Sequence, residues 1–185
     1  MQALPRVAVV AVLAALLAGC ASGAQQVPSA SPAPPQQADL GWVERAPATG
    51  PGLVFEVRRL VVTSDGWQAD VAIRNDSGVA WSLAKPPGTE TFGLMLFATG
   101  QMAELERRNE GGDLPGLRRA RSIVPAPPSV LEPGGRWSAT ISAPGALAAG
   151  RWVRLVFGTL STESPPEGLR SPLIWITDRA HALHG

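Results

Sequence analysis

The chain has 185 residues, 45% of them hydrophobic and 17% charged, which is the size and composition of one ordinary globular domain. The formal net charge of +1 excludes a large excess of Lys and Arg, so we expect no nucleic-acid partner. The 18 prolines and 20 glycines divide the chain into short elements, which favours an all-β fold over long helices.

Residues 1–19 have the composition of a signal peptide. Arg6 precedes an uncharged, mostly apolar run over 7–19 that ends in small residues. At ~1.5 Å per residue this run forms a helix of about 20 Å, short of the ~30 Å hydrocarbon core of a bilayer. We therefore expect the segment to be cleaved rather than to remain as a transmembrane helix.

The run ends at Leu17-Ala18-Gly19-Cys20, which resembles the bacterial lipobox at all four positions. The resemblance implies that the Cys20 thiol is diacylated and that a signal peptidase then cuts before it. Because the chain has one cysteine, no intramolecular disulfide competes for this thiol. Two or three acyl chains, palmitate among them, hold a protein firmly on a membrane at ~0.8 kcal/mol per buried methylene. We predict an extracytoplasmic protein that is lipid-anchored to the cell membrane or outer membrane through Cys20.

Residues 21–38 contain no charge and no aromatic side chain, and Val27 is their one bulky aliphatic residue. Such a segment buries too little apolar surface to offset its loss of conformational entropy, so we predict a linker. The stretch that follows is ambiguous, and the breaks at Pro47, Pro51 and Gly52 mark the boundary. The predicted organisation is a signal peptide over 1–19, a lipid-anchored Pro/Ala-rich linker over 20–52, a folded domain over 53–180 and a tail over 181–185.

Short apolar runs between turn residues indicate strands throughout the predicted domain. The clearest run alternates with period two, since Trp67, Ala69, Val71 and Ile73 fall on one face. The predicted strands cover 53–62, 67–75, 79–83, a hairpin over 92–107 that turns near 99–100, a short edge strand over 121–124, and 136–142, 151–160 and 172–177. Residues 102–110 are also compatible with a helix. Seven or eight strands in about 125 residues predict an antiparallel two-sheet sandwich.

Residues 131–157 resemble the second half of immunoglobulin-like and fibronectin-like extracellular bacterial modules. In those modules a Leu-x-Pro-Gly turn precedes one strand, and a loop that ends in Gly leads into the next strand. The matching residues are Leu131, Pro133, Gly134, Trp137, Gly150 and Val153. Together with the hairpin at 92–107, this turn is similar to the small β-sandwich domain of bacterial intracellular proteinase inhibitors. The resemblance implies an immunoglobulin-like sandwich.

No group of residues in the sequence predicts catalysis. His181, His184 and Asp178 have the spacing of a metal set, but no further histidine or free cysteine completes a tetrahedral site. Both histidines fall in the predicted tail, and a Gly-x-Ser-x-Gly motif is absent, so we expect no Ser-His-Asp triad. We therefore predict no metal, no cofactor and no enzymatic activity.

The tryptophans and two polar motifs have competing interpretations. Trp67, Trp81 and Trp137 occupy alternating apolar positions that predict core, whereas Trp42, Trp152 and Trp175 could be core or could grip a sugar or a peptide. The sequon at 75–77 is explained as a turn. A basic cluster near several acidic residues is interpreted as a solvated loop; it consists of Arg118, Arg119 and Arg121, near Glu104, Glu106, Glu110 and Asp113.

The leading hypothesis is a lipid-anchored, non-catalytic binding or structural module of a bacterial envelope, with an envelope protein or a glycan as its partner. An alternative hypothesis is a proteinase inhibitor that presents the loop at 109–135, around 117–121. An envelope hydrolase is the hypothesis with the least support. The sequence identifies neither a ligand nor an oligomeric state.

Overall fold

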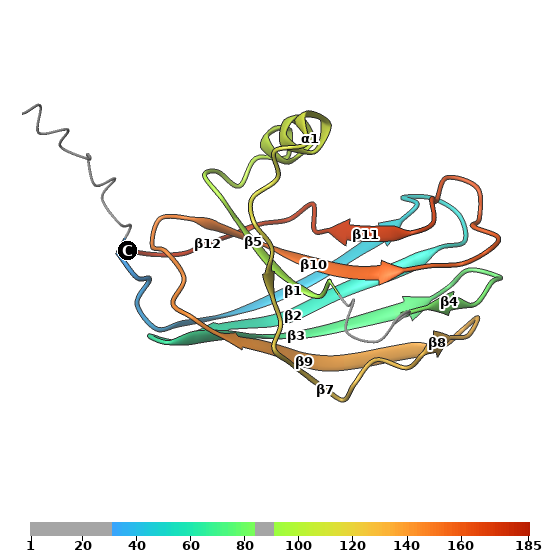
Figure 1. Ribbon diagram of the computed structural model, residues 1–185, viewed down its shortest axis with the longest axis horizontal. Coiled ribbons are helices and arrows are strands. Elements are labelled where there is room, and N and C mark those ends of the chain that lie inside the picture. Colours follow the sequence, from blue (N-terminus) through green and yellow to red (C-terminus); the bar gives the residue numbers. More distant parts are fainter. Residues whose placement is uncertain (1–30, 84–90) are drawn as a thin grey trace, which may run out of the picture.

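The computed structural model describes residues 31–83 and 91–185, so the predicted signal peptide and Cys20 lie outside the described residues. The fold is all-β with antiparallel sheets and one short helix, as the sequence predicts (Figure 1). The elements are β1 (Gln36–Ala46), β2 (Leu53–Val62), β3 (Gly66–Asn75), β4 (Trp81–Ser82), β5 (Gly93–Phe97), α1 (Met102–Gly111), β6 (Arg118–Arg119), β7 (Ser122–Val124), β8 (Val130–Leu131), β9 (Arg136–Pro144), β10 (Trp152–Leu160), β11 (Leu173–Ile176) and β12 (His181–Ala182).

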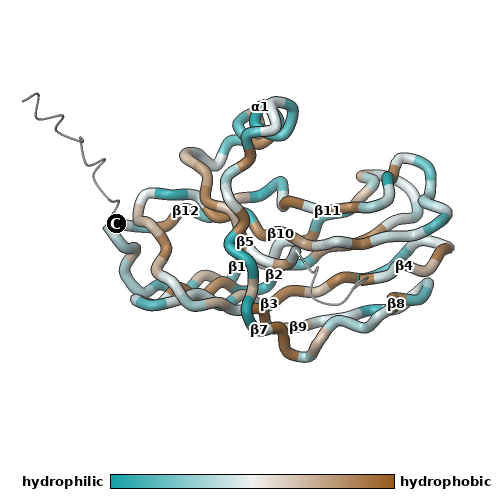
Figure 2. Tube along the Cα trace, viewed as in Figure 1, coloured by the Kyte–Doolittle hydropathy of each residue, from teal (hydrophilic) through white to brown (hydrophobic). Residues whose placement is uncertain are grey.

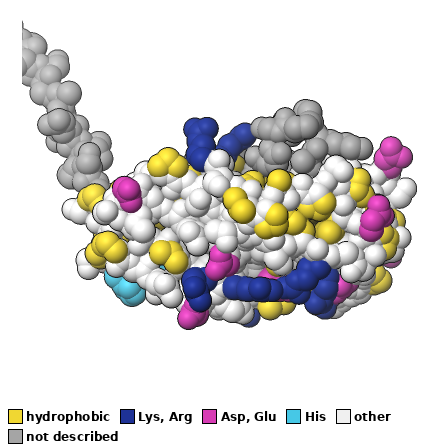
Figure 3. Space-filling view, turned by 90° about the horizontal axis from the view of Figure 1, so that it is seen from below, with side chains coloured by type: hydrophobic (Ala, Val, Ile, Leu, Met, Phe, Trp, Pro, Cys, Tyr) yellow, Lys and Arg dark blue, Asp and Glu magenta, His cyan; other side chains and the backbone are white. Residues whose placement is uncertain are grey.

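The first sheet has the strand order β1-β2-β3-β9-β7. A turn joins β2 to β3, and within it the Thr63 N–H donates to the Gly66 carbonyl at 2.9 Å, which confirms the turn predicted there. Inward-facing residues alternate along both strands, so Phe55 and Ile73 are buried at paired positions. Basic and acidic side chains lie together along part of the surface in Figure 3, with hydrophobic side chains among them. Ion pairs of outward-facing residues of this sheet include Arg136–Glu56, Arg59–Asp39 and Arg74–Asp76.

The second sheet has the order β11-β10-β5-β6, and β12 also pairs with β10. β10 is buried at most of its positions because the first sheet covers one of its faces and α1 covers part of the other. A separate two-stranded sheet, β4-β8, lies at the end of the molecule where β10 finishes (Figure 1).

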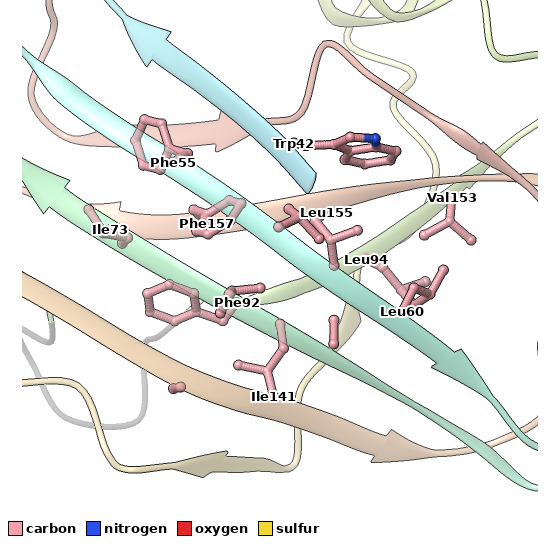
Figure 4. Close-up of a cluster of buried hydrophobic side chains, with 14 of the residues drawn as sticks. Trp42, Phe55, Leu60, Ile73, Phe92, Leu94, Ile141, Val153, Leu155 and Phe157 are labelled. Atoms are coloured by element: carbon pink, nitrogen blue, oxygen red, sulfur yellow. The ribbon is translucent and has the colours of Figure 1, made fainter. Parts of the chain in front are cut away.

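The main core fills the space between the two sheets. Phe55 of β2, Phe157 of β10 and Phe92 just before β5 meet there, with ring centroids 5.2 Å apart for Phe55–Phe157 and 6.3 Å for Phe92–Phe157 (Figure 4). Apolar residues run along the strands, whereas loops and α1 are mostly hydrophilic (Figure 2). Trp67, Trp81 and Trp137 are all buried in this core, as the sequence predicts.

Two predicted domain boundaries are wrong. The predicted linker over 20–52 contains β1, which pairs with β2 from Gln36 to Ala46. Only two of the six inward-facing side chains of β1 are large and apolar, so its alternation carries a weak apolar signal; the six are Gln36, Ala38, Leu40, Trp42, Glu44 and Ala46. The predicted tail over 181–185 contains β12, which pairs with β10. Leu183 is 2% exposed, and its N–H donates to the Arg151 carbonyl at 2.7 Å.

The predicted hairpin over 92–107 is also wrong. β5 ends at Phe97, and residues 102–111 form α1, the helix that the sequence left as the alternative. The helix has little apolar surface, with Leu105 as its buried residue, and its position is set by the loop before it. In that loop Gly100 lies against the Trp152 ring, where a Cβ atom would clash. Among the described residues, seven strands have four or more residues, and five shorter ones complete the sheets.

Glu104 links the start of α1 to the preceding loop through hydrogen bonds. Its carboxylate accepts hydrogen bonds from the Thr99 N–H and hydroxyl, each at 2.7 Å, and from the Ala98 N–H at 3.3 Å. Arg108 also donates to it, one helical turn later. Burial alone would raise the pKa of Glu104, but these hydrogen bonds outweigh it and lower the pKa to about 2.

A buried polar network holds the C-terminal segment against the sheets. The fully buried Arg154 donates to the carbonyls of Thr177 at 2.8 Å, of Asp178, of Gly100 at 3.0 Å and of Gln101 at 3.1 Å. Burial lowers the pKa of Arg154, and the nearby carboxylates oppose that shift. On the β1 side, Glu44 accepts from the Trp175 indole N–H at 3.0 Å and from two backbone N–H groups of the same segment.

The hydrogen bonds that Glu104 makes at the start of α1 predict that the stability of the fold depends on pH. Because the pKa of Glu104 is lowered in the fold from 4.5 to about 2, its carboxylate stabilises the fold above pH 4.5 and loses that effect as the pH falls toward 2. Glu104→Gln should therefore lower the free energy of unfolding at pH 7, and its difference from wild type should shrink between pH 5 and pH 2. Urea unfolding followed by tryptophan fluorescence measures this difference. Glu106→Gln is the control on the same helix, and an unchanged Glu104→Gln difference across this range would contradict the assignment.

Candidate functional site

The described chain begins and ends at one end of the molecule, at the loop between β9 and β10 (Figure 1). The Ala33 N–H donates to the Leu147 carbonyl at 2.7 Å, and the Ala149 N–H donates to the Ser31 carbonyl at 2.8 Å. These bonds fix where the segment from Cys20 joins the fold. We call this end of the molecule the proximal end.

An open groove of about 630 Å³ lies at the opposite, distal end. β10 starts beside β12 at the proximal end and leads into the groove after Leu160, and its nine residues at ~3.3 Å each span about 30 Å. The groove is lined by the turn before β4, by β4 and β8, and by the segment after β10; the lining residues are Val79, Ala80, Ser82, Val130, Ser161, Thr162, Glu163 and Ser164.

Asn75 builds the turn that forms one wall of the groove. Its side-chain NH₂ donates to the Val79 carbonyl at 2.8 Å and to the Leu131 carbonyl of β8 at 2.9 Å. Its side-chain oxygen accepts from the Ser77 N–H at 3.0 Å and from the Ser77 hydroxyl at 2.6 Å. Asn75 is 0% exposed, so the 75–77 motif forms a turn, as the sequence predicts, and its amide nitrogen is not accessible to a glycosylating enzyme.

Strand pairing fixes the other walls. Ser82 and Ser161 exchange two backbone hydrogen bonds, of 2.8 and 3.0 Å, and Ser82 also pairs with Val130 of β8. Beyond Ser161, the Thr162 N–H donates to the Ser171 hydroxyl at 2.9 Å. The backbone around the groove is therefore held in place, and its side chains face a preformed space.

The groove combines hydroxyl groups with a small apolar surface. Four lining residues are Ser or Thr, whose hydroxyls both donate and accept hydrogen bonds, and Val79, Ala80 and Val130 supply apolar contact. Glu163 is the one titratable residue of the lining. None of the candidate site residues predicted from the sequence lies in this groove; the signal for it is the hydroxyl-rich run at 161–164, directly after an apolar strand.

The histidines lie far from this groove. His181 pairs with Val153 near the start of β10, and the seven residues from there to Leu160 span about 23 Å at ~3.3 Å each. The His181 and His184 rings are 6.3 Å apart between centroids, and the pKa of His181 is lowered by burial and then by His184. In the ranges 31–83 and 91–185, no group of three or more His, Cys, Asp or Glu residues could hold a metal ion.

The three tryptophans left open by the sequence do not share an exposed face. Trp42 is 8% exposed and belongs to the main core. Trp175 stacks on Phe55 with ring centroids 5.3 Å apart and donates to Glu44. Trp152 packs with Met95, Phe97, Leu105 and Val156 in a second, smaller core cluster. These contacts make all three rings part of the packing.

The segment proposed as an inhibitory loop crosses between the two sheets. β6 pairs with β5 in one sheet, and β7 pairs with β9 in the other. Between them the Ala120 N–H donates to the Phe92 carbonyl at 2.9 Å, and the Arg121 N–H donates to the Ser142 carbonyl at 2.8 Å. Because the sheets use this backbone, the inhibitor hypothesis gains no support from it. Two of the acidic residues that lie near this segment in sequence, Glu104 and Asp113, form their ion pairs with Arg108.

Comparisons with protein-family models, curated proteins and solved structures found no match. No helix of the described ranges is long and apolar enough to cross a membrane.

The turn at Asn75 gives a test of how the groove is held. Asn75→Ala removes two donors from buried carbonyls and one acceptor from Ser77, and it should lower the free energy of unfolding by about 2–4 kcal/mol. Urea unfolding measures the loss, with Gln68→Ala on the exposed face of β3 as a control expected to stay within about 0.5 kcal/mol of wild type. Equal stabilities for the two variants would contradict the role assigned to Asn75.

Proposed function

We propose that the protein is a lipid-anchored lipoprotein of the bacterial cell envelope and acts as a non-catalytic binding or structural module. Acyl chains on Cys20 hold it on the cell membrane or outer membrane, on the extracytoplasmic side. Its two antiparallel sheets form an immunoglobulin-like sandwich, distantly similar to the domain of bacterial intracellular proteinase inhibitors. The distal groove is the surface that meets its partner.

One observation carries the proposal: the segment that follows the lipobox residues joins the fold at the end opposite the groove. The segment from Cys20 to Ser31 spans at most ~40 Å when extended. Because the junction at Ala33 is held by the loop at 145–150, this junction and the groove lie at opposite ends of β10. This arrangement suits a module that is held by one end and presents the other.

The chemistry of the groove favours binding over catalysis. Nucleophilic catalysis by a serine needs a base within hydrogen-bonding distance, about 2.6–3.2 Å. Glu163 is the one titratable group of the lining, and His181 lies about 23 Å away by the length of β10 at ~3.3 Å per residue. The hydroxyl groups instead suit hydrogen bonding to a glycan or to the backbone of an envelope protein.

The anchor is tested by replacing the thiol. Cys20→Ala should abolish acylation, so the chain should lose metabolic labelling by palmitate and leave the membrane pellet or remain unprocessed. Labelling, fractionation and intact mass measure these outcomes. Ser29→Ala, a neutral change further along the predicted linker, is the control and should behave as wild type. Unchanged labelling and processing of Cys20→Ala would refute the anchor.

The groove is tested by photo-crosslinking in the native cells. A photoreactive residue at the exposed position Glu163 should capture a partner, whereas the same residue at Gln68 on the polar face of β3 should not. Ala80→Trp, which fills the groove, should abolish capture at position 163 while leaving the thermal unfolding temperature within a few degrees of wild type. Equal capture at both positions, or capture that persists in Ala80→Trp, would argue against the groove as the binding surface.

A further inference from the structure

Three exposed arginines gather where the chain crosses from one sheet to the other. Arg118 and Arg119 form β6, and Arg121 directly precedes β7. The backbone between them is held on both sides, at the Phe92 and Ser142 carbonyls. The three guanidinium groups therefore project from a rigid ridge rather than from a mobile loop. We call these three residues the basic ridge.

The basic ridge carries charge that nearby carboxylates do not neutralise. Within the described ranges, no Asp or Glu oxygen lies within 4.0 Å of a guanidinium nitrogen of the ridge, whereas Arg59, Arg74 and Arg136 on the sheet face are all paired. Asp65 and Arg121 both line a separate hollow of about 340 Å³, and the Asp65 carboxylate there accepts a hydrogen bond from the Thr63 hydroxyl. The side chains of the ridge thus remain available to an anion.

The ridge lies beside the junction of the N-terminal segment. The Arg118 guanidinium donates to the Ala146 carbonyl at 3.3 Å, and the next residue, Leu147, accepts from the Ala33 N–H. The loop at 145–150 therefore touches both the ridge and the segment that leads back to Cys20. A chain anchored through that segment keeps its junction, and with it the loop at 145–150, within ~40 Å of the acylated residue.

A shallow hollow beside the ridge has the dimensions of a small polar headgroup. Its volume is about 310 Å³, and Trp67, Pro144 and the three arginines are among its lining residues. Guanidinium groups bind phosphate through paired N–H donors. Each basic side chain near an anionic membrane surface contributes about 1 kcal/mol, which is weak alone but sufficient to orient a protein that acyl chains already hold at the surface.

We propose that the basic ridge docks on anionic phospholipid headgroups and so orients the anchored domain with its groove away from the bilayer. This proposal rests on the proposed lipid anchor. Docking reduces the rotational freedom of the domain about its linker, and the distal groove then faces into the envelope space.

The test measures how close the ridge lies to a bilayer. The protein purified from membranes is labelled with a fluorophore at Ser122→Cys, beside the ridge, or at Ser164→Cys in the groove, and reconstituted into vesicles with an acceptor dye on the lipid surface. Energy transfer from position 122 should be higher in vesicles with phosphatidylglycerol than in pure phosphatidylcholine, and 0.5 M NaCl should reverse the increase. Transfer from position 164 should not increase.

Two triple variants of equal charge decide the outcome. Arg118→Gln/Arg119→Gln/Arg121→Gln should lose the increase caused by anionic lipid, and Arg107→Gln/Arg170→Gln/Arg179→Gln, changed at exposed positions elsewhere, should keep it. An increase that survives in the ridge variant, or none in wild type, would overturn the proposal. A failed anchor is distinguished by intact mass, because Cys20 would then carry no acyl chains whatever the vesicles show.

Discussion

Phe55 and Phe157 meet between the two sheets with their ring centroids 5.2 Å apart, and the rest of the packing is arranged around this contact. Phe92 extends it to Trp137 of β9, at 5.1 Å, so the aromatic rings cross the core from β2 to β9. Side chains of this size fill the ~10 Å between facing sheets and exclude water from it. A shift of any strand by one residue would turn its polar side chains toward these rings, which is why the register of each strand is strongly determined.

Buried polar groups hold segments at the edge of the sheets, outside the aromatic core. Arg154 donates to four carbonyl groups from two segments that are distant in sequence, and Glu44 accepts from three N–H donors of β11 and the segment after it. Each of these groups would be costly to bury alone, because an unpaired charge in the interior is strongly destabilising. Paired in this way, they attach α1 and the C-terminal segment to strands that the aromatic packing already holds in place.

The two ends of the molecule differ in chemistry, and this difference connects the fold to the proposed function. The basic ridge lies beside the middle of β10, since Arg119 pairs with Gly93 and Gly93 with Val156, and Arg118 reaches from it to the proximal loop. The junction of the N-terminal segment lies at the proximal end, whereas the distal end has a groove lined with hydroxyl groups. The rigid strand β10 separates the two, so contacts made at one end need not interfere with contacts at the other. A module that is held at a bilayer and binds a partner needs two separate contact surfaces of this kind.

The sequence by itself determined the all-β class, the burial of Trp67, Trp81 and Trp137, and the turns at 63–65 and 75–77, because alternation and turn chemistry are local properties. It also supplies the residues at 17–20 that resemble a lipobox, on which the proposed anchor depends. Only the tertiary structure decided that 36–46 is a strand and that 181–182 pairs with β10, since weak local patterns there are overridden by partners far away in the sequence. The helix at 102–111 is compatible with its local pattern, and contacts of Trp152 and Arg154 with Gly100 and Gln101 hold the loop before it. The groove and the basic ridge likewise arise from segments brought together by the fold, because their chemistry depends on distances that no local pattern encodes.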